Sequence, residues 1–255
     1  MSSVSDKSNN TKKILISQPE PENSRSPYFS LAKKFDVELS FYPFIEIEGA
    51  TVKEVRKQRI NLNDFPAVIF TSRNAMDHYF RLCDEMRVTI SQETKYFCVS
   101  EAIALYLQKH IQYRKRKVFF GNGSMTEFDA LLKKHKSTGK FLYPCISIKP
   151  SHIPNFLRSN DFEFKEAILY KTVPADLYEL SDLEFDMLVF FSPSGLESLY
   201  DNFPDFTQKN TIIATFGPNT LAKAEEFGLN VQVKAPFEGG RSMPEAIIHY
   251  FKNNK

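Results

Sequence analysis

A short apolar run, followed by polar turn residues and an amphipathic segment, occurs twice in the chain. Residues 185–203 (FDMLVFFSPSGLESLYDNF) and residues 65–80 (FPAVIFTSRNAMDHYF) share this pattern. Their equivalent serines, Ser72 and Ser192, lie 120 positions apart. A continuous apolar run bounded by turn residues is typical of a buried strand, and apolar residues every three to four positions are typical of a helix. Each copy is therefore predicted to form a strand, a turn and a helix.

A second strand, turn and helix is repeated at nearly the same offset. Residues 96–110 match residues 213–228, so that Val99 corresponds to Phe216, 117 positions later. Two successive βα units therefore repeat in register. We interpret this repeat as the duplication of an α/β half.

Two long extended stretches, residues 37–47 and 162–173, each follow a βα unit of similar pattern. If the first βα unit of the chain joins the last three, each half contains four units. The sequence thus predicts an α/β fold with two parallel-sheet α/β domains joined by a two-stranded linker, the first domain being discontinuous. The predicted boundaries are 1–40 plus 174–255 for the discontinuous domain, 47–164 for the inserted domain, and 40–47 and 164–173 for the linker strands.

The turns that open the repeated helices are rich in polar side chains. Ser194 and Glu197 have the spacing of an N-cap and the third helical residue, as have Asn74 and Asp77, so Ser194 and Asn74 are predicted to cap these helices. Helix starts beyond parallel strands also bind anions. Such turns share one edge of their sheet, and we expect the two edges to line a cleft that suits a ligand with many carboxylates.

Composition narrows the classes of function. The 255 residues include 33 basic and 31 acidic side chains, a balance that does not favour binding of nucleic acid by bulk charge. Three cysteines without CxxC spacing fit reduced thiols better than a disulfide framework. Residues 1–13 are polar and are interpreted as a disordered leader, and no apolar run approaches the roughly 18 to 20 residues of a membrane helix. We expect a cytoplasmic monomer without membrane partners.

No cofactor or metal site is predicted. The histidines are scattered without ligand spacing. Gly121 and Gly123 lack the third glycine and the acid of a dinucleotide fingerprint, and they are interpreted as a turn before a capping box from Ser124 to Glu127. Capping alone would explain any one of the remaining polar turn residues, whereas their occurrence at equivalent turns favours ligand binding. These residues are Ser72, Ser192, Ser194, Asn219 and Thr220.

Tyr170 lies in the second extended stretch, where two interpretations are open. A tyrosine in a strand is commonly a cross-strand packing residue. A phenol at a hinge between domains is also able to donate a proton to a leaving hydroxyl group.

The order and spacing of several motifs resemble uroporphyrinogen-III synthases over nearly the whole chain. The motifs are FTSRNA at 70–75, LYKT at 169–172, FFSPSG at 190–195, FGPNTLAKAEEFG at 216–228 and APFEGGRSMPEAI at 235–247. The resemblance implies two α/β domains joined by a two-stranded linker. It also implies a lyase of haem biosynthesis that cyclises hydroxymethylbilane to uroporphyrinogen III, with loss of water, inversion of the terminal pyrrole ring and no cofactor.

The resemblance also implies roles for particular residues. Tyr170 matches the family's linker tyrosine and is expected to assist loss of the hydroxyl group. Gln18 stands where the family commonly has an arginine, Ser100 and Ile103 replace a glycine and a threonine, and Asn219 replaces a threonine. The residues expected to contact the substrate are Ser72, Arg73, Asn74, Ser100, Ser192, Ser194, Gly195, Asn219 and Thr220.

Two other classes of function are considered. The first is a non-catalytic two-lobed binding protein for a tetrapyrrole or another polycarboxylate, although such receptors are usually exported and no signal peptide is predicted. The second is a receiver-like regulatory domain, and the lack of an acidic cluster after the first strand counts against it.

Overall fold

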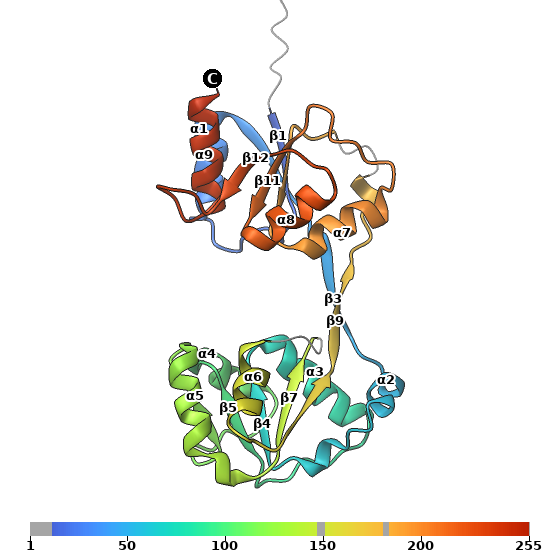
Figure 1. The fold of residues 1–255 in the computed structure, drawn as a ribbon, viewed down its shortest axis with the longest axis vertical. Helices are drawn as coiled ribbons and strands as arrows, with labels where there is room; N and C mark the ends of the chain where they lie inside the picture. Colours follow the sequence, from blue (N-terminus) through green and yellow to red (C-terminus); the bar gives the residue numbers. More distant parts are fainter. Residues whose placement is uncertain (1–11, 147–150, 181–183, 255) are drawn as a thin grey trace, which may run out of the picture. The chain divides into compact units, whose positions relative to one another are not determined.

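The chain divides into two compact units, residues 1–46 with 173–255, and residues 47–172. The computed structural model describes residues 12–146, 151–180 and 184–254. The first eleven residues of the predicted polar leader therefore lie outside the described residues. Each unit contains a parallel five-stranded sheet covered by helices on both faces (Figure 1).

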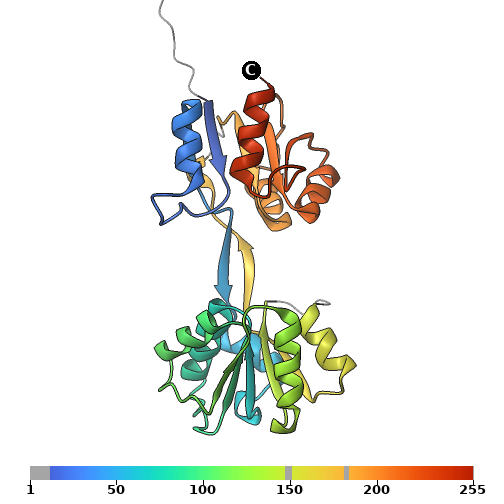
Figure 2. The same ribbon diagram turned by 90° about the vertical axis from the view of Figure 1, so that its left-hand side faces the viewer.

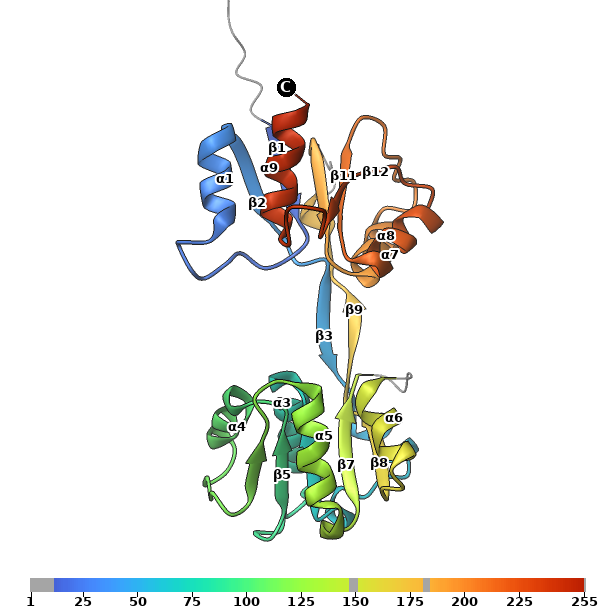
Figure 3. The same ribbon diagram turned by 60° about the vertical axis from the view of Figure 1, so that its left-hand side comes forward.

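The first unit has the strand order β12-β11-β10-β1-β2. Helices α1 and α9 pack on one face of this sheet, and α7 and α8 pack on the other (Figures 1 and 3). Ile14 and Ile16 point to the α1 and α9 face, while Leu15 between them points to the opposite face. The strands are β1 (Lys12–Ile16), β2 (Val37–Phe41), β10 (Met187–Phe190), β11 (Ile212–Phe216) and β12 (Val231–Ala235); the helices are α1 (Pro27–Phe35), α7 (Pro193–Asn202), α8 (Pro218–Glu226) and α9 (Met243–Asn253), with a 3₁₀ turn at Tyr178–Leu180.

The second unit has the strand order β6-β5-β4-β7-β8. Helices α2, α3 and α4 cover one face, and α5 and α6 cover the other (Figure 2). The strands are β4 (Ala67–Phe70), β5 (Lys95–Cys98), β6 (Val118–Phe120), β7 (Phe141–Cys145) and β8 (Phe164–Ile168); the helices are α2 (Val52–Lys57), α3 (Arg73–Glu85), α4 (Glu101–Tyr106), α5 (Met125–Lys134) and α6 (His152–Ser159), with 3₁₀ turns at Leu62–Asp64, Leu107–Lys109 and Lys136–Thr138.

The two sheets have the same topology. The run β10-α7-β11-α8-β12-α9 of the first unit corresponds to β4-α3-β5-α4-β6-α5 of the second, and β1-α1-β2 corresponds to β7-α6-β8. Each sheet has one reversal point, where the order in which the chain adds neighbouring strands changes direction. It lies between β10 and β1 in the first unit and between β4 and β7 in the second. The predicted fold class of two parallel-sheet α/β domains is confirmed.

The structure divides each predicted long extended stretch into two strands. The first stretch forms β2 and then β3 (Ile45–Gly49), separated at Pro43, whose ring nitrogen has no hydrogen to donate to a ladder. The second forms β8 and then β9 (Tyr170–Pro174), separated at Leu169, whose N–H donates to the Cys145 carbonyl. In each case the first strand joins a five-stranded sheet, and β3 and β9 pair with each other.

The caps of α3 and α7 differ from those predicted. Ser72 and Ser192 are the N-caps, each in extended conformation, and Ser194 and Asn74 are second helical residues, so the predicted capping roles were wrong. The N-cap is the residue nearest the end of the strand, where the backbone is still extended and the side-chain oxygen reaches the third helical N–H. Ser124 does cap α5, but its side chain makes no cap hydrogen bond, and the predicted capping box does not form.

Candidate functional site

Tyr170, the first residue of β9, has its hydroxyl against the turn between β4 and α3. Its Oη lies 3.2 Å from Ser72 Oγ, and either oxygen is able to donate this hydrogen bond. Ser72 Oγ also accepts from the backbone N–H of Ala75 at 3.1 Å. The ring of Tyr170 is buried in the core beneath α3, with 8% of the residue exposed. The proposed proton donor and a proposed substrate contact, 98 positions apart, are therefore in direct contact.

His78 on α3 stacks on the Tyr170 ring, with the ring centroids 5.3 Å apart and the planes 17° from parallel. Arg81 lies one turn further along the helix and donates to His78 Nδ1 at 3.4 Å and to the Ala50 carbonyl at 2.7 Å. Gly49, the last residue of β3, has no side chain to interfere: a Cβ there would lie 2.5 Å from Arg81 Nη2 and 2.7 Å from His78 Nδ1. Gly49 thus lets the end of β3 pack directly on α3 beside Tyr170.

Burial controls the protonation of both stacked rings. Burial raises the pKa of Tyr170, and the hydrogen bond with Ser72 opposes that shift, so the phenol is neutral near pH 7. Burial lowers the pKa of His78, and the Arg81 charge acts in the same direction while Asp77 opposes it. A neutral imidazole therefore faces a phenol that keeps its proton and is able to donate it.

The other predicted contacts of the second unit lie at the same sheet edge. Arg73 and Asn74 are exposed in the first turn of α3, and the Arg73 guanidinium lies 5.2 Å above the Tyr106 ring. Tyr106 in turn donates to Asp77 Oδ2 at 2.9 Å. Ser100 precedes α4, is partly buried, and makes no side-chain cap bond. The structure thus places Arg73 and Asn74 where a ligand at the Ser72 turn would meet exposed donors.

In the first unit, the turn after β10 holds three of the predicted contacts. Ser192 Oγ accepts from the Gly195 N–H at 3.2 Å, and Ser194 is partly buried beside them. Ser17, which sequence analysis missed, lies at the same place, because a Cβ built on Gly195 would be 3.8 Å from Ser17 Oγ. This proximity follows from the pairing of β1 with β10.

The turn before α8 presents one exposed and one buried predicted contact. Gly217 is the N-cap, with φ of 83°, a backbone conformation that glycine adopts without strain. Asn219 is exposed in the first turn of the helix. Thr220 is 2% exposed, so its side chain packs inside the unit. Asn219 is therefore the more accessible of the two side chains.

The Ser72 and Ser192 turns occupy equivalent and distinctive places in their sheets. Each turn follows the strand at the reversal point of its sheet, which is β4 in one unit and β10 in the other. In open parallel α/β sheets, ligands bind outside the carboxyl ends of the strands at this reversal point, where the adjoining connections run to opposite faces. The geometry therefore marks each of these turns as the candidate site of its own unit, and Tyr170 lies beside the Ser72 turn.

Among the described residues, no helix is long and apolar enough to cross a membrane. Nor does that part of the chain gather three or more histidine, cysteine or acidic side chains in a group able to hold a metal ion.

Two equivalent sheets, a discontinuous first unit and polar turns at both reversal points define a two-domain parallel α/β protein. A family model described as uroporphyrinogen-III synthase HemD matches residues 27–240. The chain belongs to the uroporphyrinogen-III synthase family, and it is therefore an enzyme of tetrapyrrole biosynthesis. This match confirms the resemblance seen in the sequence and favours the enzyme over a non-catalytic binding protein.

A solved structure of this family shares the fold at low sequence identity. The uroporphyrinogen-III synthetase of Helicobacter pylori is 18% identical, with a TM-score of 0.58, and the match covers 96% of this chain and 100% of that chain. A mutant uroporphyrinogen III synthase of Thermus thermophilus is 14% identical, with a TM-score of 0.48, covering 95% and 98%. No curated protein sequence matches the chain.

Replacing the equivalent N-cap serines should separate capping from the contact with Tyr170. Ser72→Ala and Ser192→Ala should each lower the free energy of unfolding by about 1 kcal/mol, because each removes the acceptor for a helix N–H. Ser72→Ala also deprives Tyr170 of its partner and should reduce turnover of hydroxymethylbilane beyond what the lost stability explains. Urea unfolding and initial rates of both variants test this, and a Tyr170 role independent of Ser72 would leave the rate of Ser72→Ala unchanged.

The lowered pKa of His78 predicts a stability that falls in acid. In the unfolded chain the pKa of His78 has the ordinary histidine value of about 6.5, and folding lowers it. As the pH falls, the unfolded chain therefore binds a proton at His78 before the folded protein does. Stability should therefore decrease as the pH falls from the unfolded pKa through the folded one. In His78→Phe, which keeps a flat ring against Tyr170, the fall in Tm between about pH 7.5 and 5 should be smaller.

His135 provides the internal reference for this measurement. Burial and the Lys95 charge lower its pKa as well, and it remains in both proteins, so part of the acid sensitivity should persist. Equal slopes of Tm against pH in the wild type and His78→Phe would show that His78 is not held neutral by the fold.

Proposed function

We propose that the protein is a cyclising lyase that converts hydroxymethylbilane to uroporphyrinogen III. Loss of the terminal hydroxyl group as water leaves an azafulvene cation. The far pyrrole ring attacks this cation through a spiro intermediate, and rearrangement of the intermediate inverts that ring. The pyrroles supply the electrons for both bond-forming steps, so the protein needs to donate a proton, hold carboxylates and control geometry. The observation that carries the proposal is the contact of Tyr170 with the Ser72 turn at the reversal point.

Tyr170 is proposed to donate the proton that leaves with the hydroxyl group. The Ala75 N–H donates to Ser72 Oγ, which leaves the Ser72 hydroxyl hydrogen available for Tyr170 Oη. In that orientation the Tyr170 hydrogen is free to bond to the leaving oxygen. Successive hydrogen bonds that run in one direction polarise one another, so this chain makes the phenol a better donor.

The polar turns are proposed to hold the substrate's carboxylates. Arg73 supplies an exposed positive charge in the first turn of α3, and that end of a helix also favours anions. Ser72, Asn74 and Ser100 supply further polar groups in the second unit. Ser192, Ser194, Gly195, Asn219 and Thr220 are the corresponding proposed contacts of the first unit. The exposed members of both sets, Arg73, Asn74 and Asn219, are expected to contribute most.

The direct experiment is conversion of hydroxymethylbilane by the purified protein. Free hydroxymethylbilane closes without ring inversion, so the oxidised product of the enzymatic reaction should be the type III isomer instead of type I. Chromatographic separation of the two isomers gives the answer, and a product that remains type I in the presence of the protein would refute the proposal. Sedimentation at working concentration tests the accompanying proposal that the enzyme acts as a monomer.

A further inference from the structure

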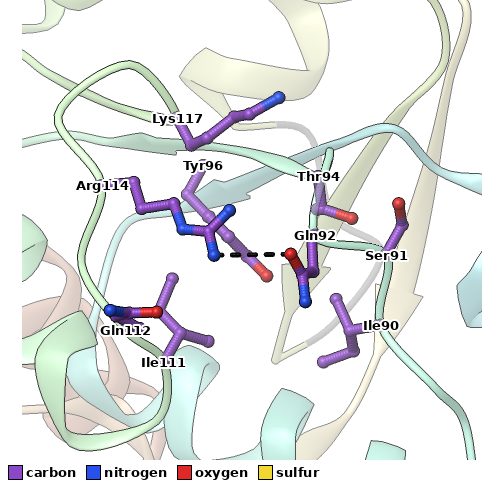
Figure 4. A pocket seen from close by; sticks show the side chains of 9 residues that line it. All are labelled: Ile90, Ser91, Gln92, Thr94, Tyr96, Ile111, Gln112, Arg114 and Lys117. Carbon is purple, nitrogen blue, oxygen red and sulfur yellow. Dashed lines mark hydrogen bonds between the residues drawn. The ribbon is translucent and has the colours of Figure 1, made fainter.

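A cavity of about 260 Å³ lies in the second unit, at the sheet edge opposite the Ser72 turn. It is formed where the chain enters β5 and β6, by side chains from residues 90–96 and 111–117 (Figure 4). In a parallel sheet all strand starts share one edge, and the helices α3 and α4 begin from the other. The cavity is therefore separate from the candidate catalytic turn of the same unit.

Tyr96 directs the hydroxyl of a buried ring into this cavity (Figure 4). The residue is 3% exposed, and its ring stacks on Phe70 with centroids 6.1 Å apart. Burial raises the pKa of Tyr96, so the hydroxyl keeps its proton and is a donor. It makes no hydrogen bond to any residue that the structure describes. Its oxygen is not among the fully enclosed polar side-chain atoms that lack a partner. It therefore opens on the cavity, where it is able to donate to an acceptor from a ligand.

Arg114 brings a positive charge into the same cavity. The single hydrogen bond of its side chain within the described residues is from Nη2 to the neutral amide oxygen Gln92 Oε1, at a long 3.4 Å (Figure 4). No carboxylate of the described chain lies within ion-pair distance of it. The nearby Glu93 instead pairs with Lys117, although the Arg114 charge contributes to lowering the pKa of Glu93. A guanidinium has five N–H donors, so most of those on Arg114 are available.

The rest of the lining is mixed. Ile90 and Ile111 form apolar walls, and Ser91 and Thr94 add hydroxyl groups. Such a combination, an apolar pocket with a few polar groups pointing into it, is typical of small-molecule sites.

We propose that this cavity binds a small organic monocarboxylate with an apolar portion of about one ring. The carboxylate accepts hydrogen bonds from the Arg114 guanidinium and the Tyr96 hydroxyl, and the apolar portion lies against Ile90 and Ile111. A single negative charge matches the site, because the Lys117 charge is already balanced by Glu93. The planar guanidinium is well suited to a planar carboxylate.

Three probes of similar size or charge test the proposal on the full chain. 3-Phenylpropionate should raise the Tm and give saturable heat in calorimetry, because a ligand that binds the folded state stabilises it. 3-Phenylpropanamide lacks the charge and acetate lacks the ring, so neither should bind measurably at the same concentration. Equal responses to all three probes, or no response to 3-phenylpropionate, would overturn the proposal.

Variants then assign the site. Arg114→Gln should weaken binding of 3-phenylpropionate by about tenfold or more, and Tyr96→Phe by roughly three- to tenfold, as expected when a carboxylate loses a charged donor or a neutral donor. Tyr96→Phe removes only a hydroxyl and keeps the core ring. Arg116→Gln, the matched change at an exposed neighbour, should leave the affinity unchanged. Undiminished binding by both Arg114→Gln and Tyr96→Phe would contradict the proposal, whatever the outcome of the isomer experiment.

Discussion

A Tyr170→Phe variant is expected to convert hydroxymethylbilane about a hundredfold more slowly than the wild type. The substitution removes the phenolic proton and the hydrogen bond to Ser72, and it leaves the ring that stacks on His78. Since the ring accounts for the packing, the loss should appear in the rate and only slightly in the Tm. Initial rates of type III product formation, with Tm and circular dichroism on the same preparations, give both quantities.

Tyr79→Phe is the matched control for this experiment. Tyr79 lies on α3 with 1% exposure, its ring contacts Phe70 and Phe80, and its hydroxyl interacts with Cys83. Tyr79→Phe thus also removes a hydroxyl group from a buried ring, but away from the Ser72 turn. The turnover rate of this variant should stay close to that of the wild type. If Tyr170→Phe also retained the wild-type rate, proton donation by Tyr170 would be excluded. Equal losses in both variants would attribute the effect to the core.

Much of the fold could be predicted because both copies of the central strand are buried on both faces. The strands β4 and β10 have no exposed residue, so the sequence of each is an uninterrupted apolar run. The repeat can therefore be recognised without knowing which strands pair. Strand order could not be predicted in the same way. It depends on contacts such as Ile14 with Met187, which join distant parts of the chain and have no local pattern.

The candidate site was predicted in outline, and its details depended on tertiary structure. The serine turns were identified from local pattern, but the choice of Ser72 and Ser192 as caps depended on where the strands end. His78 gave no signal, because it is a lone histidine on a helix until β9 passes beside it. Gly49, a glycine at the end of a predicted extended stretch, was the available signal that a backbone approaches closely there.

Replacing the central aromatic residue of the second unit should cause the largest loss of stability. Phe70 is fully buried at the end of β4 and contacts the rings of Tyr79, Phe80 and Tyr96. Phe70→Ala removes the apolar surface of the ring and leaves a cavity among residues that are fixed by a strand and a helix. The free energy of unfolding should fall by about 3 to 5 kcal/mol. Urea denaturation followed by far-ultraviolet circular dichroism measures it.

Phe120→Ala provides the same change of side chain where the residue is 40% exposed, at the end of β6. It should cost about 1 kcal/mol or less, because little apolar surface leaves the core and no closed cavity forms. The difference between the two variants therefore measures burial at Phe70 and excludes a general intolerance of alanine in the sheet. Because Phe70 immediately precedes the Thr71 and Ser72 turn, loss of its packing should also slow turnover at temperatures where the variant is still folded. A Phe70→Ala variant as stable as Phe120→Ala would mean that the core beneath α3 collapses around the missing ring, and the Ser72 turn would then move with it.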